Sequence, residues 1–338
     1  IWYYRVSAVY PASHPTNPGG ESLPSDPLVI NLPASLPYEL VITLFWSEVD
    51  GAESYRVYRS PEPDLASGSE LLLAEVLATE PRELVDDGTV TPAGASPLPL
   101  GAHGTWVALP SLGTPRAGHG LGHAVDPADP AVHYLYAVGG VDAGGASLAS
   151  YELLAITVAS ELDQTVAASW TAGAEVISLA RSQLGIYSVS HHNAPRVPVG
   201  SSYIYAVAGL DGTGDDVSDA EVAEVLAGGQ LGPFWIIDSA RNRAGFAHVA
   251  ASNFLYMMGG GPSATSAALS AEICGAGLSC TGDPDDPPDV QNWNNEGAAS
   301  LTPARYLPGS TLESAFIFVV GGVDATGAVL ASTEQTVW

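Results

Sequence analysis

The chain has 338 residues, of which 46% are apolar, and it contains 37 glycines and 26 prolines. All ten basic residues are arginines, and 37 acidic residues leave a formal net charge of −27. Such a charge disfavours nucleic acid and anionic membrane surfaces as partners, because both need clustered cations, and no apolar run approaches the roughly 20 residues of a membrane span. Short apolar runs cut by turn residues predict an all-β chain, and the length allows two domains.

The first 33 residues predict two strands. In "WYYRVSAVY" (2–10) the alternation places Tyr4, Val6, Ala8 and Tyr10 on one face, with Tyr3 beside them on the same strand. A turn-rich segment follows and leads to a second strand in "PLVINLP" (27–33).

Residues 34–95 predict further strands in "VITLFWSEV", "ESYRVYRS", "ELLLAEV" and "RELVDDG". This order resembles strands A to E of a fibronectin type III domain, with Trp46 at the position of the family's core tryptophan and Tyr55 and Tyr58 on the next strand. The strands F and G that the family would add resemble residues 1–33. The sandwich therefore reads F-G-A-B-C-C′-E along the chain.

Three explanations fit that order. Residues 1–33 could end one domain and 34–95 begin another in a polypeptide from which this chain was excised. Alternatively, the sandwich is permuted and F-G folds onto A-E of the same chain. In the third explanation F-G of one subunit completes A-E of the next, as in strand-complemented pilins, and a head-to-tail polymer results.

The remaining chain contains a fourfold repeat: "YLYAVGGVDAGGASLASYE", "YIYAVAGLDGTGDDVSDAE", "FLYMMGGGPSATSAALSAE" and "FIFVVGGVDATGAVLASTE". In each, a glutamate follows twelve residues after the second residue of a small-residue pair. An arginine precedes each pair, and a tryptophan precedes each arginine. The positions are Gly140, Gly209, Gly260 and Gly322; Glu152, Glu221, Glu272 and Glu334; Arg116, Arg181, Arg243 and Arg305; and Trp106, Trp170, Trp235 and Trp293.

This pattern resembles the kelch repeat over residues 104–338. The period of about 62 residues is longer than the family's roughly 50, and Ala208 replaces the first glycine of one pair. The resemblance implies a β-propeller of four blades in which Arg and Glu pair internally, Trp fills the space between blades, and the strand around Trp106 completes the fourth blade. The expected domains are residues 1–33 (F-G), 34–100 (A-E) and 101–338 (propeller).

Few residues suggest chemistry. Cys274 and Cys280 predict a local disulfide, which suits an extracellular or cell-surface location. Calcium is the cofactor that two Asp-rich loops could hold, through Asp211, Asp215, Asp283 and Asp285, although solvated turns explain them as well. No catalytic residue is predicted.

The expected function is that of a secreted or cell-surface structural protein. It would be a self-assembling subunit of an extracellular filament, sheath or adhesin, joined by strand complementation to copies of itself. The alternative is a carbohydrate-binding module of a larger extracellular protein, with glycans as partners. Kelch propellers joined to an immunoglobulin-like domain also occur in copper radical oxidases similar to galactose oxidase, and that is the third candidate.

Overall fold

The computed structural model describes residues 1–15, 17–32, 40–99, 102, 107–160, 163–237, 242–261, 264–274, 288–290, 293–294 and 300–338. These residues form antiparallel sheets, as the prediction of an all-β chain requires, and they contain no helix. It follows that no helix in this part of the chain could cross a membrane. The chain divides into two compact units, residues 1–109 with 160–163 and residues 110–159 with 164–338.

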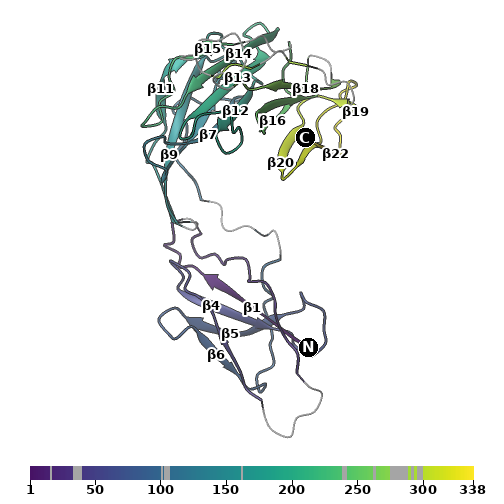
Figure 1. The fold of residues 1–338 in the computed structure, drawn as a ribbon. Coiled ribbons are helices and arrows are strands. Elements are labelled where there is room, and N and C mark those ends of the chain that lie inside the picture. Colours follow the sequence, from purple (N-terminus) through teal and green to yellow (C-terminus); the bar gives the residue numbers. More distant parts are fainter. Residues whose placement is uncertain are drawn as a thin grey trace. The chain divides into compact units, whose positions relative to one another are not determined.

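The first unit contains two sheets (Figure 1). One has the order β2-β1-β4-β5, and the other pairs β3 with β6. Their bounds are β1 Trp2–Val9, β2 Leu28–Ile30, β3 Ile42–Phe45, β4 Ser54–Arg59, β5 Leu71–Leu77 and β6 Glu83–Asp86. Residues 33–39, most of which belong to the predicted A-E segment, lie outside the described residues.

The core of this unit forms because β1 alternates as the sequence predicts. Tyr4 packs with Leu44 of β3 and Val57 of β4, and Ala8 and Tyr10 pack with Tyr55. Trp46 packs against both groups, and its ring centroid lies 5.7 Å from that of Tyr55. One face of β1 is thus buried between the two sheets.

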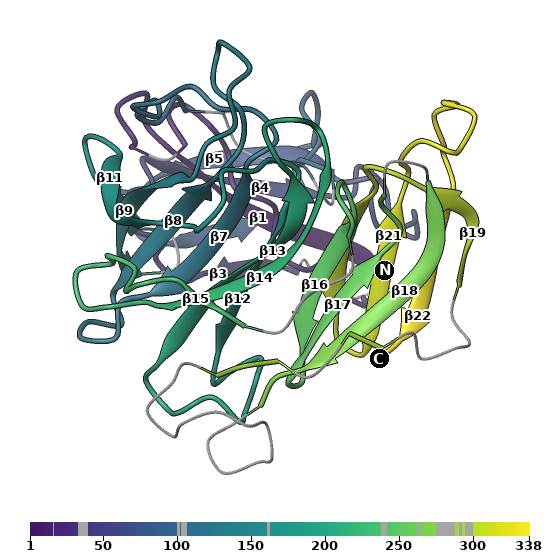
Figure 2. The same cartoon turned by 90° about the horizontal axis from the view of Figure 1, so that it is seen from above.

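The second unit contains four sheets, one for each sequence repeat (Figure 2). The first has the order β10-β9-β8-β7, with β11 also pairing with β9; the others are β12-β13-β14-β15, β16-β17-β18-β19 and β20-β21-β22. The bounds are β7 Gly120–Val125, β8 Val132–Val138, β9 Ser150–Ser160, β10 Asp163–Val166, β11 Thr171–Val176, β12 Gly185–Ser190, β13 Ser202–Leu210, β14 Asp216–Glu224, β15 Trp235–Ile236, β16 Ala247–Ala251, β17 Phe254–Met258, β18 Thr265–Glu272, β19 Ser300–Arg305, β20 Gly309–Glu313, β21 Phe316–Val320 and β22 Thr333–Val337.

Consecutive sheets pack face to face through their first strands: β7 against β12, β12 against β16, and β16 against β20. One core cluster fills the space between the first and second sheets, a second cluster the space between the second and third, and a smaller one the space between the third and fourth. We call the face of each sheet that is turned toward the following sheet its forward face, and the opposite face its backward face.

The expected closure of the four sheets into a ring is not found in the described part of the chain. The first strands of the first and fourth sheets make no contact comparable to those between consecutive sheets, and the fourth sheet has three strands. Trp106, around which the closing strand was predicted, lies outside the described residues, and residues 107–110 form no strand. Instead, the carbonyl of Pro110 accepts a hydrogen bond of 2.9 Å from Nε1 of Trp170, beside the first sheet.

Candidate functional site: the first strand and the repeat junctions

The predicted assembly strand is β1, and it lies at the centre of its own chain's sheet. β1 pairs with β2 on one side and with β4 on the other, and Tyr4 lies opposite Arg59. The buried hydroxyl of Tyr4 donates to Asp86 at 2.7 Å, and Arg59 binds the same carboxylate at 2.5 Å. In the structure, β1 is therefore paired on both sides by strands of its own chain.

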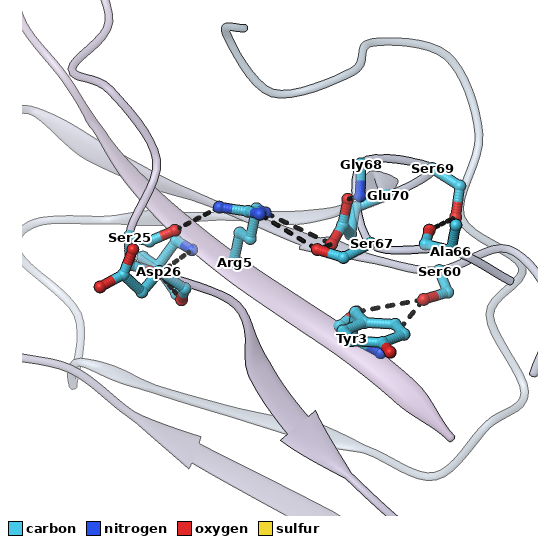
Figure 3. Close-up of polar contacts among 11 residues, drawn as sticks. Tyr3, Arg5, Ser25, Asp26, Ser60, Ala66, Ser67, Gly68, Ser69 and Glu70 are labelled. Atoms are coloured by element: carbon cyan, nitrogen blue, oxygen red, sulfur yellow. Dashed lines mark hydrogen bonds and ion pairs between the residues drawn. The ribbon is translucent and has the colours of Figure 1, made fainter. Parts of the chain in front are cut away.

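Figure 3 shows how the outer face of β1 is tied to distant segments. Arg5 donates to the carbonyl of Ser25 at 2.8 Å, to the hydroxyl of Ser67 at 3.1 Å and to Glu70 at 3.3 Å. The Glu70 side chain is fully buried. At Tyr3 the backbone N–H donates to the hydroxyl of Ser60 at 3.1 Å. These bonds hold β1 to the segments that precede β2 and β5.

The repeated Arg and Glu residues form ion pairs in three of the four repeats. Nη2 of Arg116 lies 2.9 Å from Glu152, Nη2 of Arg181 lies 2.8 Å from Glu221, and Arg305 binds Glu334. Burial raises the pKa of Glu152, but hydrogen bonds from the Thr114 backbone and from Arg116 outweigh it and bring the pKa below its ordinary value. The three carboxylates also cap a backbone N–H near the arginine, at Thr114, Ser178 and Thr302.

The third repeat departs from this scheme. In the first and second sheets the repeated glutamates, Glu152 and Glu221, lie opposite Ala137 and Ala206. The residue of the third sheet that is equivalent to these alanines is Met257, and it lies opposite Leu269. Glu272 is three residues farther along β18 and binds Arg196. The connection after the glycine pair is shorter in this repeat, so the constant twelve-residue spacing does not place Glu272 at the repeated position.

The arginines also bind the backbone in a repeated way. Nη1 of Arg116 donates to the carbonyls of Gly139 and Ser150, Nη1 of Arg243 to those of Gly259 and Ala267, and Nη1 of Arg305 to those of Gly321 and Ser332. Each guanidinium thereby joins the end of the second strand of its sheet to the third. Arg243 keeps this role although Leu269 occupies the position of the glutamate.

Two series of backbone hydrogen bonds join consecutive repeats. The second residue of each small-residue pair donates to the carbonyl of the next repeat's arginine: Gly140 to Arg181 at 2.9 Å, Gly209 to Arg243 at 2.9 Å and Gly260 to Arg305 at 2.8 Å. The second series joins the residues that lie two positions after each arginine. The Gln183 amide donates to the Gly118 carbonyl at 2.7 Å, the Gly245 amide to the Gln183 carbonyl at 3.0 Å, and the Leu307 amide to the Gly245 carbonyl at 2.7 Å. These four residues all have positive φ.

Backbone conformation explains why small residues occupy both positions of each pair. Gly139, Gly259 and Gly321 have φ between 63° and 67°, a region in which a side chain is strained. Ala208 adopts the same conformation, with φ of 54°. A Cβ at Gly140 would lie 2.8 Å from the carbonyl oxygen of Ala117, so close strand approach excludes larger residues there.

The forward faces of the sheets carry apolar side chains at equivalent positions. Two, four and six residues before the second residue of each pair lie Val138, Tyr136 and Tyr134 in the first repeat and Val207, Tyr205 and Tyr203 in the second. All six are buried against the following sheet. In the fourth repeat the same positions hold Val320, Phe318 and Phe316, and Val320 is 47% exposed and Phe316 39% exposed.

The predicted tryptophans differ in their surroundings. Trp293 is buried between the second and third sheets, with its ring 6.3 Å from that of Tyr187, as the expected filling of space between repeats requires. Trp170 is half-buried and bound to Pro110. Trp235 on β15 is 49% exposed and does not fill a junction among the described residues.

Two of the candidate calcium ligands, Asp211 and Asp215, form hydrogen bonds within a turn. Oδ1 of Asp211 accepts hydrogen bonds from the Thr213 and Asp215 amides at 2.8 and 3.0 Å, and the Thr213 hydroxyl bonds to both aspartates. These bonds lower the pKa of Asp211. Asp283 and Asp285 lie outside the described residues, and within the described ranges no three His, Cys, Asp or Glu side chains are grouped so as to hold a metal.

Cys274 is disulfide-bonded. Cys280, its predicted partner, lies outside the described residues. The sulfur of Cys274 also lies 3.8 Å from the carbonyl of Glu272, at the end of β18.

A cavity of about 640 Å³ lies between the third and fourth sheets. Its walls are mostly apolar and include Phe254, Tyr256, Met258, Ile317 and Trp338.

Two features were not predicted from the sequence: the backbone role of the residue two positions after each arginine, and the exposure of the forward face of the fourth sheet. For the first feature the sequence contains one sign only: two of the four residues, Gly118 and Gly245, are glycines.

No protein-family model matches the chain, and a search of curated proteins found no match either.

Proposed function

We propose that this chain is an extracellular or cell-surface structural protein that acts by associating with copies of itself. Its first unit is interpreted as a fibronectin III-like sandwich with F and G placed first, and its second as a kelch-like array of four repeats. The order β2-β1-β4-β5 with a separate β3-β6 pair supports the first interpretation, since G-F-C-C′ and B-E are the corresponding sandwich sheets. The repeated arginine bonds and glycine pairs support the second.

The observation that carries the proposal is the forward face of the fourth sheet. Its residues are Gly309, Thr311, Glu313, Phe316, Phe318, Val320, Thr333, Gln335 and Val337. Only one of them is charged, in a chain with 37 acidic residues, and Val337 is 64% exposed. Repeat arrays need a polar outer face on their terminal repeats to remain soluble alone, and a face with exposed aromatic side chains and few charges is typical of a protein contact.

The position of β1 within its own sheet changes which surface is expected to connect two copies of the chain. β1 and β2 occupy their positions within their own chain, so strand complementation through residues 1–33 is not required for association. The proposal therefore assigns the contact between copies to the repeat array.

Two features favour an extracellular location. The disulfide at Cys274 suits an oxidising compartment. In addition, among the residues that the structure describes, at least eight arginines are in ion pairs with carboxylates of the same chain. Such pairing leaves a strongly acidic surface, which favours solubility and is compatible with that location.

The test is the state of association of the purified chain. Sedimentation velocity over a hundredfold concentration range, followed by negative-stain microscopy at the highest concentration, should show species larger than the monomer. A chain that sediments as a monomer throughout would contradict the proposal.

The alternative of a carbohydrate-binding module has the cavity between the third and fourth sheets as its supporting observation. Aromatic rings at Phe254, Tyr256 and Trp338 could stack on a sugar. A glycan array with the intact chain tests it: specific hits that are lost in Tyr256→Ala would favour this function over self-association.

A further inference from the structure

We propose that the forward face of the fourth sheet binds the backward face of the first sheet of a second copy, head to tail. The inference rests on the proposed self-association and names its interface. The contact would repeat the junction that joins consecutive repeats within one chain.

The backbone supplies the first reason. Each internal junction uses one bond from the small-residue pair to the next arginine carbonyl and one bond between the residues two positions after the arginines. At the end of the array, within the described ranges, the Gly322 amide has no backbone acceptor and the Leu307 carbonyl has no backbone donor. At the start, the Gly118 amide likewise has no backbone acceptor. The two ends are therefore complementary: the Leu307 carbonyl of one copy can accept from the Gly118 amide of another.

The side chains of the fourth sheet supply the second reason. Phe316, Phe318 and Val320 occupy the positions at which Tyr134, Tyr136 and Val138 are buried by the second sheet. The hydroxyl of Tyr136 crosses that junction to the carbonyl of Gly229 at 2.9 Å, and that of Tyr205 crosses the next to Pro288 at 2.6 Å. The corresponding Phe318 has no hydroxyl, so its burial would need no such polar partner.

The first sheet presents a matching surface. Its backward face includes Leu121 and His123 of β7 and His133 and Leu135 of β8, as the register of that sheet shows. Leu121 is 60% exposed, and His123 is also exposed. Nε2 of His123 lies 2.9 Å from Nδ1 of His133. In the second and third sheets, the positions equivalent to Leu135 are Ile204 and Leu255, and both are fully buried against the preceding sheet.

Net charge sets the conditions under which the contact forms. Two copies that each carry −27 repel one another, and the repulsion is screened over about 8 Å at physiological ionic strength and over less at higher salt. Because the two faces themselves carry few charges, added salt weakens the repulsion without weakening the contact. Association should therefore increase with salt concentration.

The symmetry of the contact follows from its two different faces. A heterologous contact either closes into a ring or continues as a filament. It also allows one end of a chain to be blocked while the other stays intact, which an isologous contact between two fourth sheets does not allow.

The experiment uses two blocking variants of the full chain, Val320→Glu at the fourth sheet and Leu121→Glu at the first. Val199→Glu is the matched control, because Val199 is 83% exposed in the loop between β12 and β13. Sedimentation velocity is run in about 0.5 M NaCl, where the Debye length is under roughly 5 Å. Circular dichroism and the melting temperature confirm that each variant folds.

Each blocking variant alone should associate roughly 30-fold or more weakly than the unmodified chain, because an unpaired charge would enter the contact. The control should associate as the unmodified chain does. A 1:1 mixture of Val320→Glu and Leu121→Glu should form a dimer and nothing larger, since one intact end of each kind remains.

Three outcomes would overturn the inference. If the unmodified chain associates and both blocking variants associate equally well, the interface is wrong while the proposed function stands. If the blocked variants fail to form a dimer in the mixture, the contact is not head to tail. If the unmodified chain is monomeric at every salt and protein concentration, the inference and the proposed function both fail.

Discussion

The Arg181–Glu221 pair offers the sharpest test of how the repeats are held. Both side chains are fully buried, and Nη2 of Arg181 lies 2.8 Å from Oε1 of Glu221. Nη2 also donates to the carbonyl of Ala206 at 3.0 Å, whereas Nε and Nη1 have no hydrogen-bond partner in the described part of the chain. Burial lowers the pKa of Arg181, and the charge of Glu221 opposes that shift.

Glu221→Gln keeps the shape of the side chain and removes its charge. The guanidinium of Arg181 then remains buried beside a neutral amide, a change that costs about 3–5 kcal/mol of the free energy of unfolding. For a unit of this size that loss lowers the melting temperature by roughly 6–20 °C. The double variant Arg181→Met with Glu221→Leu removes both charges, so it should be more stable than the single variant.

The matched control is Glu334→Gln. Its side chain is 28% exposed, so water already screens this ion pair and the loss of the carboxylate charge should destabilise the chain less. Calorimetry of the full chain measures all variants, with the two units fitted as separate transitions. A loss below about 1 kcal/mol for Glu221→Gln, as for a surface ion pair, would refute the assignment of the pair as a buried electrostatic contact.

Three other changes test the fold. Gly140→Ala should destabilise the chain by more than the control Gly145→Ala, which also has positive φ but open space around it, because the added Cβ at Gly140 meets the Ala117 carbonyl at 2.8 Å; the control alone should lose roughly 1–2 kcal/mol in urea unfolding. Tyr4→Phe should destabilise the first unit by about 1–3 kcal/mol, because the buried Asp86 loses a donor, while Tyr3→Phe should change the urea midpoint little. Burial lowers the pKa of His248, so the folded state favours the neutral imidazole. The free energy of unfolding should therefore fall as the pH drops from 7.5 toward 5.5. In urea titrations over the same pH range, the free energy of unfolding of His248→Gln should fall less.

The sequence was sufficient to predict β1 in the first unit and the central strands of the four repeats in the second. Alternation in residues 2–10 placed Tyr4 and Ala8 on a buried face, and the structure shows that face against Leu44 and Tyr55. The repeat likewise located Arg116, Arg181 and Arg305 beside their glutamates. These inferences succeed because strand periodicity and repeated spacing are local properties of the chain.

The third repeat shows where spacing fails. Glu272 keeps its distance from Gly260 along the chain, but a shorter connection moves it three residues beyond the repeated position, which Leu269 occupies. A count of residues does not reveal how many of them a turn uses. The pairing register does, and it is a property of two strands together.

The tertiary structure alone decided three matters that concern function. It placed β1 in the sheet of its own chain, left the first and fourth sheets without a common junction among the described residues, and left Phe316 and Val320 exposed. In the sequence, the fourth repeat's "FIFVVGG" differs little from the first repeat's "YLYAVGG". A strand encodes which side chains share a face, but whether that face is covered depends on which sheet lies against it in space.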